Sequence, residues 1–150
     1  MAFSFHGFIG AEPALNGIRM RFPAARIIAL GQELFLIPLT DALQRQMNGS
    51  GEAVPVNGFE LLTGAIEEAA LVVSEAGPLS YAEVLQWTGE GSQAAIMWEG
   101  GLRVRTFRYG QDLINRILRT YGAIAGPGQD EFTALGFAAR RFTDDWLREG

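Results

Sequence analysis

The sequence contains no cysteine, no lysine and one histidine, and each scarcity excludes a kind of chemistry. Without cysteine the chain forms no disulfide and offers no thiol nucleophile or Cys-ligated metal site. His6 alone cannot supply the ligand cluster of a transition metal, and no serine stands in a nucleophile-elbow context. We therefore predict no catalytic residue, no bound metal and no cofactor.

Long hydrophobic runs are also missing. The best run, residues 27–39, is interrupted by Gly31-Gln32-Glu33, and no stretch reaches the roughly 18 apolar residues of a membrane span. The first residues show no basic region before an apolar core, so we expect no signal peptide and a cytoplasmic protein that does not bind membranes. All twelve basic residues are arginine, which with abundant alanine and glycine is typical of a GC-rich bacterial genome.

The net charge of −5 is distributed unevenly along the chain. Residues 33–99 contain ten acids and one arginine, whereas residues 100–122 contain five arginines and one aspartate. An acidic middle disfavours nucleic acid as a partner, because phosphate binding requires a basic face. It permits a basic protein partner, and the alternative is a solvated surface that keeps the chain dispersed.

The order of expected elements predicts a single α+β domain over residues 1–150. We expect strands at 3–9, 26–30, 33–37, 79–87, 94–98 and 102–107, and helices at 40–47, 63–76 and 111–121. Strands that come in clusters favour a mostly antiparallel sheet with an N-terminal hairpin and a C-terminal three-stranded meander, packed by two main helices. The expected details are a type II′ turn at Gly31-Gln32, a loop at residues 12–17, helix caps at Thr40, Asp130 and Thr143, and a last strand with Leu102 and Val104 inward and Arg103 and Arg105 outward.

Residues 89–94 spell G-x-G-x-x-A, the pattern of a dinucleotide-binding loop. That loop requires a helix that begins at the glycines, so that its free N–H groups hold the pyrophosphate. Only six residues, 93–98, precede the next glycine turn, and Glu90 would place a carboxylate beside a phosphate. The pattern therefore predicts a hairpin turn.

Glu83 differs from the other acids, because it lies in mid-strand on the face of Tyr81, Leu85 and Trp87. If that face is the core, Glu83 is a buried carboxylate that needs a partner, and we expect an arginine. If that face instead lines a cleft, Glu83, Trp87, Arg103 and Asp144 form a pocket of a small hydrolase or ligand-binding enzyme.

Three stretches, "YAEVLQWTGEGSQAAIMWEGG", "INRILRTYG" and "DEFTALGFAARRFTDDW", with an echo at "LFLIPLTDAL", resemble a group of small bacterial proteins of unknown function. Some proteins of that kind act as immunity proteins to secreted toxins. The likeness covers mainly the C-terminal half and includes no catalytic signature, so it implies no active-site residue.

Our first hypothesis is a non-enzymatic protein whose acidic face occludes a basic protein partner, as an immunity protein would. The expected contact residues are Glu67 and Glu68 on the helix and Glu90, Gln93 and Glu99 at the turns of the meander. The enzyme with a pocket around Glu83 is the alternative, and a structural homo-oligomer such as a homodimer is a third possibility.

Overall fold

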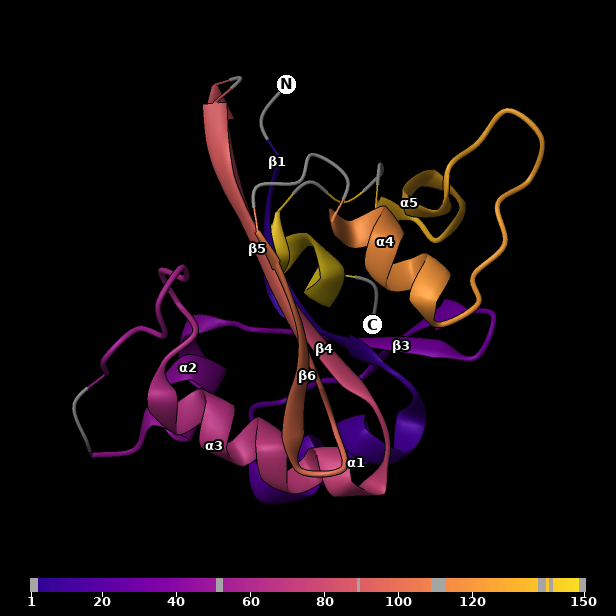
Figure 1. The fold of residues 1–150 in the computed structure, drawn as a ribbon. Helices are drawn as coiled ribbons and strands as arrows, with labels where there is room; N and C mark the ends of the chain where they lie inside the picture. The colour runs from indigo at the N-terminus through magenta and orange to yellow at the C-terminus, as the bar shows by residue number, and fades with distance from the viewer. Residues whose placement is uncertain are drawn as a thin grey trace.

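The computed structural model describes residues 3–50, 53–88, 90–108, 113–137, 140 and 142–148, and it has the predicted α+β architecture (Figure 1). Six strands form one sheet in the order β2-β3-β1-β4-β5-β6, with every neighbouring pair antiparallel. They are β1 (Phe3–Gly10), β2 (Ile28–Gly31), β3 (Leu34–Pro38), β4 (Leu79–Thr88), β5 (Glu90–Glu99) and β6 (Leu102–Arg108).

Helices cover both faces of the sheet. One face packs against α1 (Glu12–Arg21), α2 (Asp41–Asn48), α3 (Gly64–Val73) and the short η1 (Ser74–Ala76), which lie together at the lower end of Figure 1. The other face packs against α4 (Leu113–Thr120), α5 (Glu131–Ala134) and η3 (Thr143–Arg148). Successive side chains of a central strand point to opposite faces of the sheet. The sheet therefore separates two hydrophobic cores. In β1, Phe8 belongs to the first core and Phe5 and Ile9 to the second.

The N-terminal hairpin and the C-terminal meander are confirmed by the strand pairing. The G-x-G-x-x-A pattern lies where β4 turns into β5, and residues 90–99 continue as a strand with no helix. A pyrophosphate cradle of the dinucleotide type is therefore excluded at this position, because residues 90–99 form a strand and no helix begins there whose free N–H groups could hold the phosphates.

Three expectations about local structure were wrong. Residues 12–17, expected as a loop, begin α1, where a proline in the first turn and arginines in the last turn suit a helix. The β2–β3 turn has Gln32 and Glu33 at its centre, both with positive φ, so it has the conformation of a type I′ turn and not type II′. Thr143 does not cap a helix, because its hydroxyl contacts His6.

The inward and outward faces of β6 were also predicted wrongly. Leu102 and Val104 are 67% and 51% exposed, whereas Arg103 reaches across the first face to Glu67 on α3. The pairing of β5 with β6 shifts between Met97↔Arg105 and Trp98↔Arg103, which leaves Val104 as an extra residue. Such a β-bulge breaks the strict alternation of side chains on which the prediction depended.

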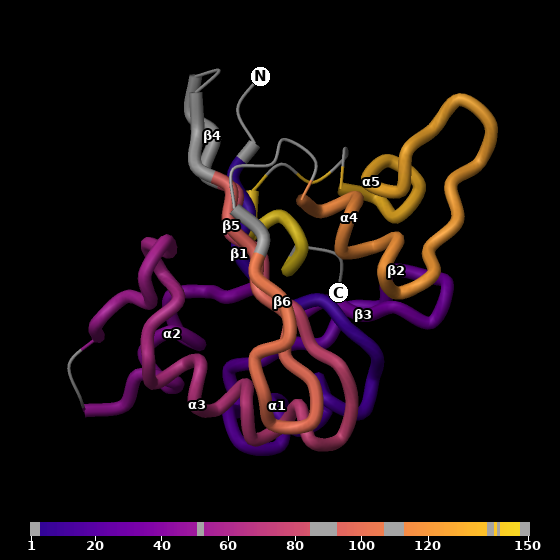
Figure 2. Tube along the Cα trace, in the orientation of Figure 1, coloured from indigo at the N-terminus to yellow at the C-terminus, as the bar shows by residue number. Residues whose placement is uncertain are grey.

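The two ends of the described chain meet at β1. β3 pairs only with residues 7–10 of β1, and Ser4 forms an isolated parallel bridge with Phe142 beside the uncovered part of that edge. The N–H group of His6 donates to Thr143 Oγ1 at 3.1 Å. Figure 2 shows the yellow C-terminal segment beside the indigo first strand. The C-terminal segment thus covers the edge of β1 that β3 leaves open.

Candidate functional site

Glu83 is buried, as one of the two sequence interpretations required, but its partners are not arginine. Its carboxylate accepts hydrogen bonds from the backbone N–H groups of Glu60, Leu61 and Leu62, at 2.7–2.9 Å. The hydroxyl of Tyr81 donates a fourth hydrogen bond of 2.7 Å. Burial, followed by the charge of Glu83 and this hydrogen bond, raises the pKa of Tyr81 well above its ordinary value, so the phenol stays protonated and donates.

These four hydrogen bonds give Glu83 a structural role. Three successive N–H groups aimed at one carboxylate form an anion-binding concavity, here filled by the protein's own side chain. The bonds attach the segment before α3 to the middle of the sheet. Of the expected pocket, Arg103 is paired with Glu67, the side chain of Trp87 lies outside the described residues, and Asp144 lines a cleft that Glu83 does not line.

Glu67, predicted to contact a partner, is already engaged within the protein. Its carboxylate accepts the indole N–H of Trp98 at 2.8 Å and the Nε–H of Arg103 at 3.0 Å. Partial burial by itself would raise the pKa of Glu67, but the hydrogen bonds from Arg103 and Trp98 and the charge of Arg103 outweigh burial and lower it. The carboxylate is therefore ionised at neutral pH and joins α3 to β5 and β6.

The other predicted contact residues have different surroundings. Glu68 is exposed on α3, and Glu99 is exposed at the turn between β5 and β6. Gln93 is half-buried on β5, and the side chain of Glu90 lies outside the described residues. A further exposed acid, Glu75, lies against this turn, since its Cγ is 3.4 Å from the place where a Cβ on Gly101 would be. The sequence alone did not indicate Glu75, because its proximity to the turn follows from the docking of η1.

Exposed apolar residues lie beside these acids. Leu102 and Val104 belong to β6, which is the last strand of the sheet and is hydrogen-bonded to β5 alone among the described strands. Val72 is 56% exposed on α3, one helical turn after Glu68. The Glu67–Arg103 pair and the contact of Glu75 with Gly101 show that α3, η1 and the β5–β6 hairpin adjoin. We call the exposed residues of these elements the α3–β6 surface, with members Glu68, Val72, Glu75, Glu99, Leu102 and Val104; the exposed Arg103 and Arg105 lie on the same strand as the last two.

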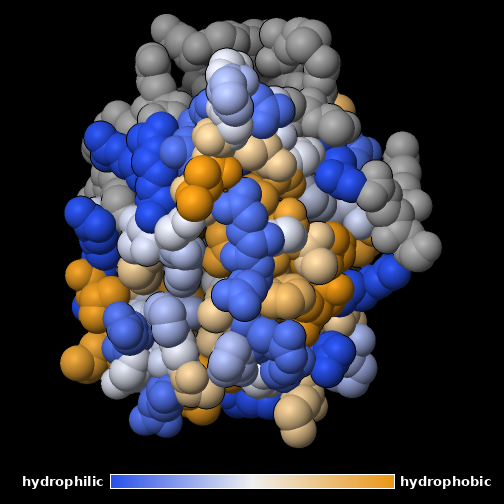
Figure 3. Space-filling model, turned by 90° about the vertical axis from the view of Figure 1, so that its right-hand side faces the viewer, coloured by the Kyte–Doolittle hydropathy of each residue, from blue (hydrophilic) through white to orange (hydrophobic). Residues whose placement is uncertain are grey.

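At the opposite edge of the sheet, the β2–β3 hairpin contacts the segment of residues 121–130. Figure 3 faces the side on which the β2–β3 hairpin and residues 121–130 lie, and hydrophobic side chains emerge there between hydrophilic ones. Ile28 and Leu30 of β2 are half-buried, and Ile124 is 77% exposed. The amide of Gln32 accepts from Ile124 N at 2.7 Å and donates to Ile124 O at 2.9 Å, as a paired strand would. The 121–130 segment is thereby fixed against the hairpin.

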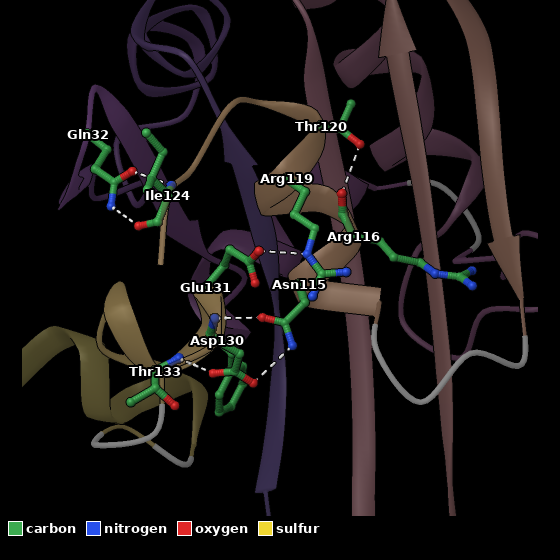
Figure 4. A network of polar contacts seen from close by, with 10 residues as sticks. Gln32, Asn115, Arg116, Arg119, Thr120, Ile124, Asp130, Glu131 and Thr133 are labelled. Atoms are coloured by element: carbon green, nitrogen blue, oxygen red, sulfur yellow. Dashed lines mark hydrogen bonds and ion pairs between the residues drawn. The ribbon is translucent and has the colours of Figure 1, made fainter. Parts of the chain in front are cut away.

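A polar network fixes the same segment to α4 and α5 (Figure 4). Asn115, which is buried, accepts the N–H of Phe132 at 2.7 Å and donates to Asp130 at 3.1 Å. Asp130 also caps α5 as predicted, by accepting the N–H of Thr133 at 2.9 Å. The ion pair of Arg119 with Glu131 completes the network. Because these polar groups satisfy one another, the network is a structural support and not a site that awaits a ligand.

His6 lies beside a cleft, where acids from three elements act on it. Its Nδ1 is 3.2 Å from Thr143 Oγ1, and Asp144 on η3, Asp41 on α2 and Glu83 on β4 are close enough to affect it electrostatically. Burial lowers the pKa of His6 and outweighs the opposing effect of these acids. The imidazole is therefore neutral at pH 7 and able to accept a hydrogen bond.

Neither a metal cluster nor a membrane helix is present in the described part of the chain. No group of three His, Asp or Glu side chains there could hold a metal ion, and no helix there is long and apolar enough to cross a membrane. Comparisons with protein-family models, with curated proteins and with solved structures found no match. The resemblance to immunity proteins therefore remains a prediction from the sequence.

Proposed function

We propose that the chain is a non-enzymatic domain that binds a protein partner through the α3–β6 surface. The observation that carries this proposal is the exposure of Leu102 and Val104, at 67% and 51%, on a strand whose outer edge pairs with no other described strand. Exposed apolar side chains on an edge strand offer both backbone hydrogen bonds and hydrophobic contact to an added segment. The bulge and the exposed arginines of β6 are features that discourage non-specific pairing at an edge, so the exposed apolar side chains favour a specific partner.

The exposed acids at one end of this surface indicate the charge of the partner. The carboxylates of Glu68, Glu75 and Glu99 make no hydrogen bond or ion pair with any residue that the structure describes. We infer that basic groups of the partner meet them, while its apolar groups cover Leu102 and Val104. A basic toxin occluded by its immunity protein would be such a partner, and this is the class that the sequence resemblance implies.

A second copy of the chain is a less favourable occupant of the same edge. In an antiparallel β6–β6 pairing centred on Val104, Arg103 of one copy would lie opposite Arg105 of the other. Like charges directly opposite each other across a strand pair are destabilising. Sedimentation of the isolated chain shows whether a second copy binds. A stable dimer that dissociates when Leu102 and Val104 are substituted would mean that a second copy, and not another protein, covers this edge.

The proposal predicts that a double variant, Leu102→Gln with Val104→Gln, loses its partner. The matched control is Met20→Gln, since Met20 is 83% exposed on α1 outside the surface. Affinity capture from the lysate and secreted fraction of the source organism, with mass spectrometry, would compare the three proteins. We expect a basic protein to be retained by wild type and control at a level at least tenfold above the double variant.

The salt dependence of association tests the role of the acidic residues of the α3–β6 surface. The association rate with the captured protein should fall as salt is raised, and Glu75→Gln with Glu99→Gln should reduce that salt dependence. Retention by the double apolar variant at the wild-type level, or a blank capture from both fractions, would refute the proposal.

A further inference from the structure

A cleft lies between the end of β3, the start of α2 and η3, apart from the α3–β6 surface. Its volume is about 560 Å³, and a neighbouring hollow of about 200 Å³ extends it to His6. The two share Thr40, Asp41 and Asp144 as lining residues. A cleft of several hundred Å³ is of the size that takes small molecules in proteins.

Three charged side chains line the larger part of the cleft, namely Arg26, Asp41 and Asp144. All three residues are exposed, and their charged groups make no hydrogen bond or ion pair with any residue in the described part of the chain. Elsewhere in the molecule the described arginines Arg103 and Arg119 are paired with acids. The cleft thus offers two carboxylates and one guanidinium to a ligand.

The rest of the lining is mainly apolar. Pro23, Ala24, Pro38, Ala42 and Leu147 provide walls for a hydrocarbon chain. The smaller hollow adds hydroxyl groups and the neutral imidazole of His6, which can accept a hydrogen bond. An apolar wall with a few placed polar groups is the usual composition of a small-molecule site.

We propose that this cleft binds a small zwitterion of net positive charge, the chemical class of the basic α-amino acids. Asp41 and Asp144 supply negative charge for two cationic groups joined by a short hydrocarbon chain, and Arg26 supplies positive charge for one carboxylate. Guanidinium and carboxylate pair through charge-assisted hydrogen bonds, which are about twice as strong as neutral ones. The site is independent of the protein partner, because none of the α3–β6 residues lines it.

The test is a titration of the isotope-labelled full chain with L-arginine, followed by amide chemical shifts. We expect saturable shifts at residues 39–43 and 142–147 in the millimolar range or below. L-Citrulline, which lacks the side-chain charge, should bind roughly tenfold more weakly, as expected for the loss of one charged hydrogen bond. Sodium chloride at matched ionic strength is the control for non-specific effects.

Two sets of variants test which charged residue of the cleft binds which group of the ligand. Asp41→Asn with Asp144→Asn should weaken L-arginine binding at least tenfold, whereas Glu33→Gln, an exposed acid outside the cleft, should leave it unchanged. Arg26→Gln should weaken L-arginine but leave agmatine, which has no carboxylate, at its wild-type affinity. The amide spectrum of each variant reports whether it is folded, and Asp144→Asn alone replaces the double variant if that one is not.

Three results would overturn the proposal. The first is an absence of saturable shifts around the cleft with L-arginine. The second is equal binding by wild type and the Asp41→Asn, Asp144→Asn variant. The third is equal sensitivity of L-arginine and agmatine to Arg26→Gln. Leu102→Gln with Val104→Gln should leave the titration unchanged, which separates this site from the α3–β6 surface.

Discussion

At the scale of single residues, Glu83 shows how one buried charge can organise a loop. Four donors surround its carboxylate, and three of them are backbone N–H groups of successive residues, Glu60 to Leu62. Removing one partner of a buried charged network is costly, because the remaining groups are left without the water that they had in the unfolded chain. Glu83 is therefore a test of whether this network stabilises the fold.

We predict that Glu83→Gln lowers the free energy of unfolding by about 2–4 kcal/mol. The amide keeps one acceptor oxygen, but its NH₂ group faces N–H and O–H donors that it cannot accept from. Urea unfolding followed by tryptophan fluorescence measures the change, and Glu68→Gln, an exposed acid on α3, is the control. A loss below about 0.5 kcal/mol, the range of ordinary surface substitutions, would contradict the assigned role.

The sequence identified Glu83 as a special acid but not its partners. Its place in the alternation of β4 indicated burial, and a buried charge requires compensation. The compensation comes from main-chain groups, which every residue possesses and which no side-chain pattern reveals. The cleft could not be predicted for a different reason. Its charged residues Arg26, Asp41 and Asp144 come from three segments that only the fold brings together.

At the scale of elements, α1 and α3 pack closely because α1 contains Gly17. A Cβ at this position would lie 2.8 Å from Val73 Cγ1 and 3.0 Å from Val73 Cβ, closer than atoms in contact can be. Val73 is buried and β-branched, so its side chain has few other rotamers to adopt. The glycine that weakens α1 as an isolated helix is the residue that permits its packing.

We predict that Gly17→Ala destabilises the protein by about 1–2 kcal/mol, although alanine is the better helix former. In a Val73→Ala background, where the obstructing methyl groups are absent, the same substitution should be neutral or stabilising. Thermal unfolding of the four proteins gives the coupling energy of the cycle. A destabilisation of equal size in both backgrounds would show that the two helices do not meet at this glycine.

Elements with strong periodicity were predictable, and those that depend on their neighbours were not. Thr40 caps α2 and Thr63 caps α3, and the apolar stripe of α3 is buried as its spacing indicates. The exposure of Leu102 and Val104 could not be predicted, because it depends on the bulge and on which strand ends the sheet. The glycine and asparagine within α1 disguised a helix that its packing against α3 stabilises.

At the scale of the whole molecule, His6 links the pH of the solution to the stability of the fold. In the folded state the pKa of His6 lies below its ordinary value of 6.5, and burial is the main cause. The unfolded chain therefore takes up this proton first as the pH falls. The contribution of the neutral imidazole is present above pH 6.5 and is lost as the pH falls through 6.5 toward the folded pKa.

We predict that the free energy of unfolding decreases between pH 7 and pH 5, and that His6→Asn flattens this decrease. Asparagine retains a polar atom for Thr143 but does not titrate. Urea unfolding at several pH values measures both profiles. An equal slope in wild type and His6→Asn would assign the pH dependence to other groups.

The position of β1 has a consequence for how the chain folds as it is made. β1, which precedes the other described strands in the sequence, occupies the middle of the finished sheet, between β3 and β4. Its pairing with β4, which places His6 opposite Glu83, forms only after residue 83 has been synthesised, and its contact with Thr143 joins residues 137 positions apart in sequence. Pairings so distant in sequence fold slowly, and until then the apolar strand has an open edge. Until β4 has been synthesised, a nascent chain therefore exposes one edge of β1 to other chains.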